Sequence, residues 1–198
     1  LKNLDTTGEV VLIDTKGTLS VTQGLMDAFG DGKIEFEAEN GNFELGGNIN
    51  TGSRDVVFCS NFNVLSGVYG VNVATGKTVE LMSNNNIVDF IVTGEGTVFG
   101  NGKSVKVVHR DPGKQLTIGA ITTTDGDIVL SSTGSLLVND QLGADGNVNI
   151  SADQGIDVFD TITATKNIAI SSQNNVEINS SVTATGNLSL TADSDDNN

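Results

Sequence analysis

The sequence predicts an all-β protein folded as a right-handed parallel β-helix (β-solenoid), and three observations support this fold class. The C-terminal third repeats every 20 residues, in blocks that begin at Leu142, Ile162 and Val182. Within each block aliphatic residues alternate with small polar ones, which is the period of a half-buried strand. Glycine or asparagine stands at the breaks between these runs. Because no coil of this kind can bury its apolar side alone, stability requires that successive coils stack.

The alternation also predicts which side chains point inward, since like residues recur at the same place in every block. Each block supplies three short strands with two or three inward side chains apiece. We expect a right-handed winding, because right-handed crossovers between parallel strands are strongly preferred. The length of the chain predicts roughly nine coils, each about 4.8 Å high. The expected buried columns are Leu142, Ile162, Val182; Ala144, Ala164, Ala184; Ile128, Val148, Ile168, Leu188; Leu130, Ile150, Ile170, Leu190; Leu116, Leu136, Ile156, Val176; and Ile118, Val138, Val158, Ile178.

We expect a single solenoid over residues 1–198, with irregular coils over 1–112 and regular ones over 113–198. In the N-terminal part, the apolar runs that end in Leu12, Phe36 and Phe58 recur at 22–24 residues, which indicates longer corners. Seven of the eight phenylalanines precede residue 100, which predicts an interior that is wider or covered by loops. We interpret residues 25–29 as a short helical or turn excursion and residues 109–114 as a corner loop.

Charge and composition exclude several classes of function. Ten basic residues against 25 acidic ones give a net charge of −15, so the basic footprint of a nucleic-acid-binding protein is absent. The single cysteine, Cys59, lies in an apolar run, where a buried and inert thiol is expected. No apolar stretch approaches the roughly 18 residues of a membrane-spanning helix. The chain begins at Leu1 without a signal-peptide pattern, so we expect a piece of a longer protein.

An asparagine column marks one corner of the regular coils. Asn147, Asn167 and Asn187 occupy the same place in three successive blocks. Asparagine tolerates left-handed backbone conformations, and its amide can bond to the copies above and below. Because the residue recurs in every coil, the column is predicted to be a structural ladder and not a ligand site.

The segment Gly-Asn-Val-Asn-Ile-Ser-Ala-Asp-Gln-Gly-Ile-Asp-Val (146–158) and its repeat over 167–178 resemble the repeats of filamentous-haemagglutinin-type proteins. The resemblance is best over 113–192 and weaker over 1–112. It lies in alternating aliphatic residues, Gly-Asn corners and Ser, Thr or Ala fillers. Members of that family are large bacterial surface adhesins exported by two-partner secretion, and they fold as right-handed β-helices. The family's secretion-domain motifs, Asn-Pro-Asn-Gly and Asn-Pro-x-Leu, do not occur in this sequence.

The resemblance implies a secreted, cell-surface fibre protein that functions in cell adhesion. Its expected partner is a protein or glycan receptor, or a second copy bound end to end. We expect no enzyme activity, no cofactor and no catalytic or metal-binding residues. One cysteine and one histidine exclude the usual zinc ligand sets, and the calcium-binding nonapeptide of repeat toxins is absent.

A polysaccharide-active β-helix enzyme, either a lyase or a hydrolase, is the first alternative. Acid/base cleavage of a glycosidic bond needs two carboxylates on one face. The candidates are Asp125 with Asp127, or Asp157 with Asp160 and Glu177. A solvated acidic strip explains the same residues, and a lone His109 beside Arg110 and Asp111 in a loop makes a poor site. Stacked Thr-x-Thr pairs resemble an ice-binding array, but Gly143 and Asp145 interrupt them.

A self-assembling filament subunit is the second alternative. By register, Asp196 and Asn198 take the places of the buried residues Val176 and Ile178, so the last block does not complete its third strand. The ends of a solenoid expose apolar rows and unpaired strand edges. We therefore expect the coil that contains Leu188 and Leu190 to be covered, either by a continuation of the chain or by another copy.

Overall fold

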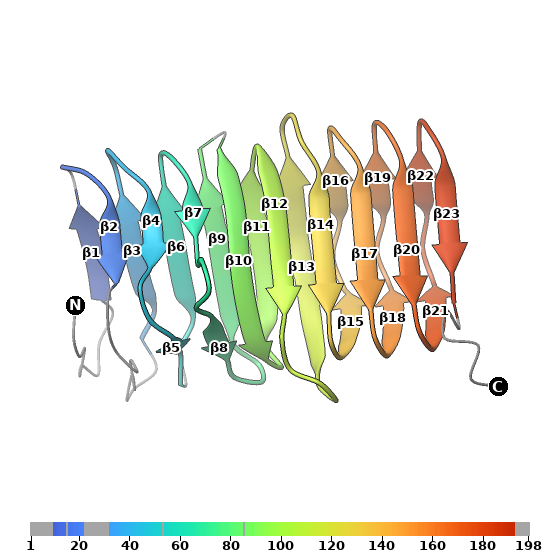
Figure 1. Ribbon diagram of the computed structural model, residues 1–198, viewed down its shortest axis with the longest axis horizontal. Helices are drawn as coiled ribbons and strands as arrows, with labels where there is room; N and C mark the ends of the chain where they lie inside the picture. Colours follow the sequence, from blue (N-terminus) through green and yellow to red (C-terminus); the bar gives the residue numbers. More distant parts are fainter. Residues whose placement is uncertain (1–9, 15, 22–31, 53, 85, 193–198) are drawn as a thin grey trace.

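The computed structural model describes residues 10–14, 16–21, 32–52, 54–84 and 86–192, and the regular elements of this part are all β-strands. The strands wind into a parallel β-solenoid. In Figure 1 the nearer strands run downward and the farther ones upward as the chain advances from the N-terminal to the C-terminal end, so the winding is right-handed. The predicted fold class is therefore confirmed. The described residues contain no helix that is long and apolar enough to cross a membrane.

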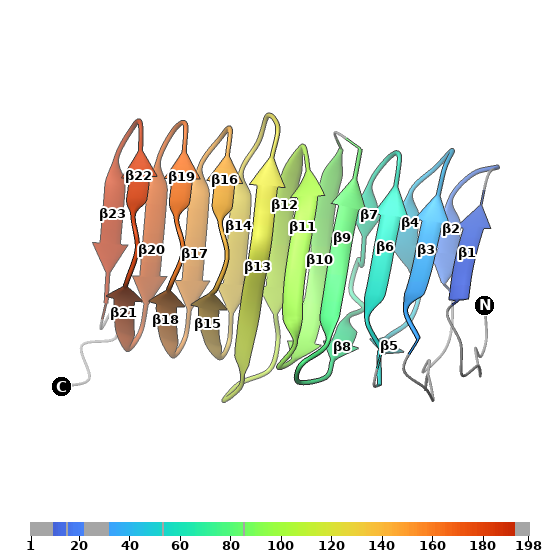
Figure 2. The same ribbon diagram turned by 180° about the vertical axis from the view of Figure 1, so that it is seen from behind.

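Two parallel sheets, which we call sheets A and B, form the walls of the solenoid (Figures 1 and 2). Sheet A contains β1 (Val10–Asp14), β3 (Ile34–Ala38), β6 (Val56–Ser60), β9 (Thr78–Ser83), β11 (Thr97–Gly102), β13 (Gln115–Thr123), β15 (Ser135–Val138), β16 (Leu142–Ala144), β18 (Gly155–Val158), β19 (Ile162–Ala164), β21 (Asn175–Ile178) and β22 (Val182–Ala184). Sheet B contains β2 (Leu19–Val21), β4 (Phe43–Leu45), β5 (Ile49–Asn50), β7 (Val64–Leu65), β8 (Val71–Val73), β10 (Ile87–Gly94), β12 (Ser104–His109), β14 (Ile128–Ser132), β17 (Val148–Ala152), β20 (Ile168–Ser172) and β23 (Leu188–Thr191).

The predicted inward columns are present in the observed register. Leu142 pairs with Ile162, which pairs with Val182, and the alanine column and the four longer columns pair in the same way. Together with the inward side chains of the earlier coils, they form one continuous hydrophobic core that extends from Val21 to Ile170. The equal lengths of these coils hold every inward row in line, because a slip by one residue would turn each side chain to the other face.

The N-terminal coils also pair in parallel, and β9 to β12 are longer than the strands of the regular coils. Leu12 pairs with Phe36 and Phe36 with Phe58, as the 22–24-residue spacing predicts. Most coils before β13 consist of one strand in each sheet, with β5 and β8 as short additions to sheet B. The long strand β13 pairs with both β15 and β16, so it is at β13 that one long strand of sheet A divides into two short ones. The predicted excursion at residues 25–29 lies outside the described residues.

Phenylalanine rings fill the N-terminal interior. The rings of Phe36 and Phe58 stack with centroids 5.5 Å apart, and Phe43 and Phe90 lie 4.7 Å and 5.2 Å from Phe58. All four side chains are fully buried. The concentration of phenylalanine before residue 100 therefore reflects an aromatic core in place of the aliphatic rows of the later coils.

Cys59 differs from expectation. It lies on the outer side of β6, between Glu37 and Met82 of the neighbouring strands, and it is half-buried. Burial raises the pKa of the thiol, and Glu37 and Glu35 raise it further. The thiol is therefore protonated at neutral pH, which agrees with an inert cysteine although not with a fully buried one.

The last described coil exposes apolar side chains. Leu188 and Leu190 of β23 are 47% and 50% exposed, whereas Ile168 and Ile170, one coil earlier, are 1% exposed. Val176, Ile178 and Val182 are also only partly buried. Within the described residues no further coil covers these rows.

The first prediction compares two phenylalanines four residues apart. Phe58→Ala removes a fully buried ring and should lower the free energy of unfolding by about 3–5 kcal/mol, because it leaves a cavity in the aromatic core. Phe62→Ala, at a ring that is 46% exposed, should change it by less than about 1 kcal/mol. Urea unfolding followed by circular dichroism measures both values. Equal losses in the two variants would contradict the assigned core.

Candidate functional site

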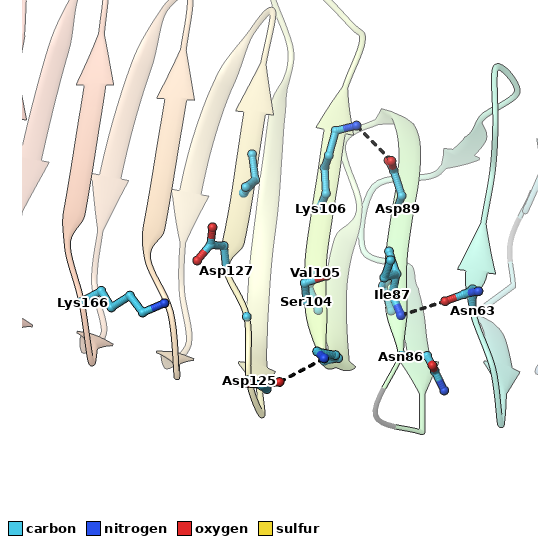
Figure 3. Close-up of a pocket in the computed structure, with 14 residues that line it drawn as sticks. Asn63, Asn86, Ile87, Asp89, Ser104, Val105, Lys106, Asp125, Asp127 and Lys166 are labelled. Carbon is cyan, nitrogen blue, oxygen red and sulfur yellow. Dashed lines mark hydrogen bonds and ion pairs between the residues drawn. The ribbon is translucent and has the colours of Figure 1, made fainter.

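A hollow of about 760 Å³ lies on the outer face of sheet B, over β10, β12 and β14 (Figure 3). We call it the Ser104 hollow, because the small side chain of Ser104 lies between larger neighbours. Ile87 pairs with Ser104 on one side, and Asp127 occupies the same register position on the other. The exposed Ile87 and the outward Val129 give the hollow an apolar part.

The corner beside this hollow lacks side chains in two successive coils. The corner residues that come just before the aligned positions of β12, β14, β17 and β20 are, in that order, Lys103, Gly126, Gly146 and Lys166. A Cβ atom on Gly126 would lie 2.8 Å from the Lys103 carbonyl oxygen, and one on Gly146 would lie 2.6 Å from the Gly126 carbonyl oxygen. Only glycine fits these closely packed corners. Lys166 therefore extends across the Gly146 corner toward Asp127, as Figure 3 shows.

Charged groups of both signs line the rim of the Ser104 hollow. The ammonium groups of Lys106 and Lys103 each lie 3.0 Å from a carboxylate oxygen, of Asp89 and Asp125 respectively. The ammonium group of Lys166 has no ion pair among the described residues. Because these side chains are about half exposed or more, the two pairs contribute little to stability.

The asparagine column makes the hydrogen bonds of a ladder. Asn167 donates from Nδ2 to Oδ1 of Asn147 (3.0 Å), and the Asn187 backbone amide donates to Oδ1 of Asn167 (2.8 Å). Asp127 begins this ladder, because its Oδ1 accepts from the backbone amide and Nδ2 of Asn147 at 2.7 and 3.0 Å. From the sequence, Asp127 is a candidate carboxylate but not a predicted part of the ladder, although it stands directly before an inward aliphatic residue, as the three asparagines do.

A second amide ladder lies in the N-terminal coils. Asn63 donates from Nδ2 to Oδ1 of Asn42 (3.1 Å), and the Ile87 backbone amide donates to Oδ1 of Asn63 (3.0 Å). Neither Ile87 nor Ser104 carries an amide, so the side-chain ladder is interrupted at these two coils. The Ser104 hollow therefore occupies the gap between two ladders.

The candidate carboxylates are divided between the two sheets. Asp125 and Asp127 line the Ser104 hollow. Asp157 pairs in register with Glu177 on the outer face of sheet A, as the repeat predicts, and Glu177 accepts a 3.0 Å hydrogen bond from Asn179. One carboxylate oxygen of Asp125 pairs with Lys103, and one oxygen of Asp127 accepts from Asn147.

His109 is an interior residue, which corrects the prediction that it belongs to a corner loop. It ends β12 and is fully buried, and its Nε2 donates to the Gly94 carbonyl oxygen at 3.0 Å. The Ser132 hydroxyl lies 2.8 Å from Nδ1. Burial is the largest effect on the imidazole and lowers its pKa, and Lys114 lowers it further, against opposing effects of the Gly94 carbonyl and Asp111. The neutral ring thus accepts a hydrogen bond from the Ser132 hydroxyl at Nδ1, an assignment that follows from the hydrogen-bond network.

A second hollow of about 480 Å³ lies further along β10, and we call it the Arg110 hollow. Arg110, Lys114 and Asp111 line it, together with Asn50 and Asn72, whose amides lie 3.4 Å apart in register. Lys114 pairs with Asp111 at 3.4 Å. The basic residues of the chain beyond residue 100 are Lys103, Lys106, Arg110, Lys114 and Lys166, and each of them lines one of the two hollows.

Comparison with known proteins gives no relative: no family model, no curated protein and no solved structure matches the chain. Among the described residues, no group of three or more His, Cys, Asp or Glu side chains is placed to hold a metal ion. We take the two hollows on sheet B as the candidate site.

The second prediction tests the ladder. Asn167→Ala removes the acceptor for the Asn187 amide and the donor to Asn147, and should lower the free energy of unfolding by about 1–2 kcal/mol. Asn149→Ala, in the next outward column, is the matched control and should have an effect of less than about 0.5 kcal/mol. Urea unfolding again gives the comparison, and a loss as large in Asn149→Ala would contradict a stabilising role of the ladder.

The third prediction concerns pH. His109 is the only histidine, and its pKa in the folded protein lies below the unfolded value of 6.5. As the pH falls below about 6.5, the unfolded chain takes up this proton first, so stability is lost until the pH reaches the lower folded pKa. His109→Val, which copies Val92 of the same column, should lack this loss between pH 6.5 and pH 5. Unfolding curves of both proteins measure the difference, and parallel pH profiles would contradict the prediction.

Proposed function

We propose that this chain is a segment of an extracellular bacterial surface or fibre protein, and that its function is extension and adhesion. The observation that carries the proposal is the rod itself, in which successive coils repeat in register along one axis (Figure 1). Such a stack extends by one coil at a time, needs no disulfide bond and presents its outer faces to partners. The repeat pattern over 113–192 resembles that of filamentous-haemagglutinin-type adhesins, which supports the same function.

The fourth prediction tests this location. Antibodies raised against the folded protein should label intact cells of the organism that carries the gene, and mild proteolysis of those cells should remove the label. Antibodies against a cytoplasmic enzyme serve as the control and should label only lysed cells. Labelling that appears only after lysis would contradict an extracellular role.

A polysaccharide-active enzyme is a second candidate, because Asp125 and Asp127 share a hollow and Asp157 lies beside Glu177. We expect no turnover when the protein is incubated with polygalacturonate or alginate, with and without Ca²⁺, and assayed for unsaturated or reducing ends. Turnover that is lost in Asp127→Ala or Asp157→Ala would reverse the ranking of the two functions.

End-to-end association of copies is a third candidate, because Leu188 and Leu190 are about half exposed on the last described coil. The fifth prediction is that light scattering detects association that grows with protein concentration. Leu190→Asp should weaken it, since a carboxylate buried in the apolar contact is costly. Phe159→Asp changes an exposed apolar residue of a corner and should associate like the original protein. A protein that stays monomeric at high concentration would contradict end-to-end association.

A further inference from the structure

The distribution of positive charge singles out the outer face of sheet B. The protein carries a net charge of −15, yet the five basic residues beyond residue 100 all line the two hollows. Three of them form ion pairs with Asp89, Asp125 and Asp111. The remaining two, Lys166 in the Ser104 hollow and Arg110 in the Arg110 hollow, have no ion pair in the described part of the chain. Each hollow therefore offers one cation to an incoming anion.

Residues of one strand, β10, line both hollows. Ile87 and Asp89 of β10 line the Ser104 hollow, and Ile91 and Thr93 of the same strand line the Arg110 hollow. Asp89 and Ile91 are two positions apart, or about 7 Å along a strand. Side chains on one side of an extended polypeptide recur at the same interval. An extended peptide laid along β10 therefore places successive side chains over the two hollows.

The chemistry of the Ser104 hollow suits a peptide side chain. Exposed Ile87 and outward Val129 provide apolar surface, and Lys103, Lys106 and Lys166 lie at its rim. An apolar centre with a charged rim is the usual arrangement of a protein–protein contact. No aromatic side chain lines either hollow, so neither offers the flat ring face on which sugar rings commonly pack.

We infer that the two hollows form one docking face for an extended polypeptide segment of a receptor, which carries an aliphatic or aromatic side chain flanked by carboxylates. The apolar side chain occupies the space over Ser104, beside Ile87. The flanking carboxylates pair with Lys166 and Arg110, the two cations that lack an ion pair within the described residues. This inference rests on the proposed adhesive function and names the partner class and the surface that binds it.

Fluorescence anisotropy with three synthetic peptides tests the chemistry of the partner. The first peptide carries one phenylalanine between glutamate runs, the second replaces glutamate by lysine, and the third replaces phenylalanine by serine. The first should bind more tightly than either of the others, and its affinity should fall as salt is added. A polygalacturonate oligosaccharide is included as a competing anionic ligand. Binding of that oligosaccharide without binding of the first peptide would overturn the assignment to a polypeptide.

Variants of the protein test the site. Lys166→Glu and Arg110→Glu should each weaken binding of the first peptide by about two- to tenfold, because each replaces an attraction by a repulsion. Lys77→Glu makes the same change of charge outside both hollows and should bind like the original protein. Ser104→Phe fills the hollow and should abolish binding, whereas Ser151→Phe, at an outward position of β17 away from both hollows, should not.

Unfolding midpoints of all variants establish that each one is folded before its affinity is compared. Equal affinity of Lys166→Glu and Lys77→Glu would overturn the docking face. Cell-surface labelling by antibody distinguishes this failure from failure of the proposed function. If antibodies label the protein on intact cells and the Lys166→Glu and Arg110→Glu variants adhere as the original protein does, the proposed adhesive function stands and the docking face is refuted.

Discussion

Each coil of this solenoid has an inner apolar row that it cannot bury alone, and backbone hydrogen bonds to the next coil are the only way to extend the core. Parallel pairing in register then forces the residue at each inward position to stack on its counterpart, as Val148 stacks on Ile168 and Ile168 on Leu188. The same constraint acts outside the core. Side chains that align can bond to one another, and the ladder from Asp127 to Asn187 results from that alignment. Core, ladder and coil length are therefore consequences of one stacking rule.

The stacking rule confines functional variation to outward columns and corners. An inward polar residue is tolerated where its hydrogen bonds are satisfied, as those of His109 are by Gly94 and Ser132. An outward polar residue stays in contact with solvent and has no such cost of burial. Ser104 can therefore interrupt a column between Ile87 and Asp127 without disturbing the core beneath it. Binding surfaces on such a fold arise where neighbouring coils carry side chains of different size, and the two hollows of sheet B are of this kind.

The columns of the regular half and the Leu12–Phe36–Phe58 register were predictable, because the alternation of two and the spacing of about 20 residues are properties of the sequence alone. The interior place of His109 was also signalled, by the alternation Val105, Val107, His109, but the following Arg-Asp-Pro-Gly sequence indicated a loop and outweighed it. The Ser104 hollow was not predictable in the same way. It depends on Ser104 lying beside Ile87 and Asp127, which are 17 and 23 positions away in the sequence. These separations reflect irregular coil lengths, which no repeat in the sequence reveals.

The charge that an acidic ligand experiences depends on its distance from the two hollows. A net charge of −15 repels an acidic partner at long range, but at physiological ionic strength that repulsion is screened beyond about 8 Å. A carboxylate that reaches the rim of the Ser104 hollow interacts chiefly with the charges around it, where three lysines and three aspartates balance. Two of those lysines are already paired with Asp89 and Asp125, and Oδ1 of Asp127 accepts two hydrogen bonds from Asn147, so Lys166 is the cation left to pair with an incoming carboxylate. An acidic protein can thus hold an acidic ligand locally while its overall charge limits unspecific association with other acidic molecules.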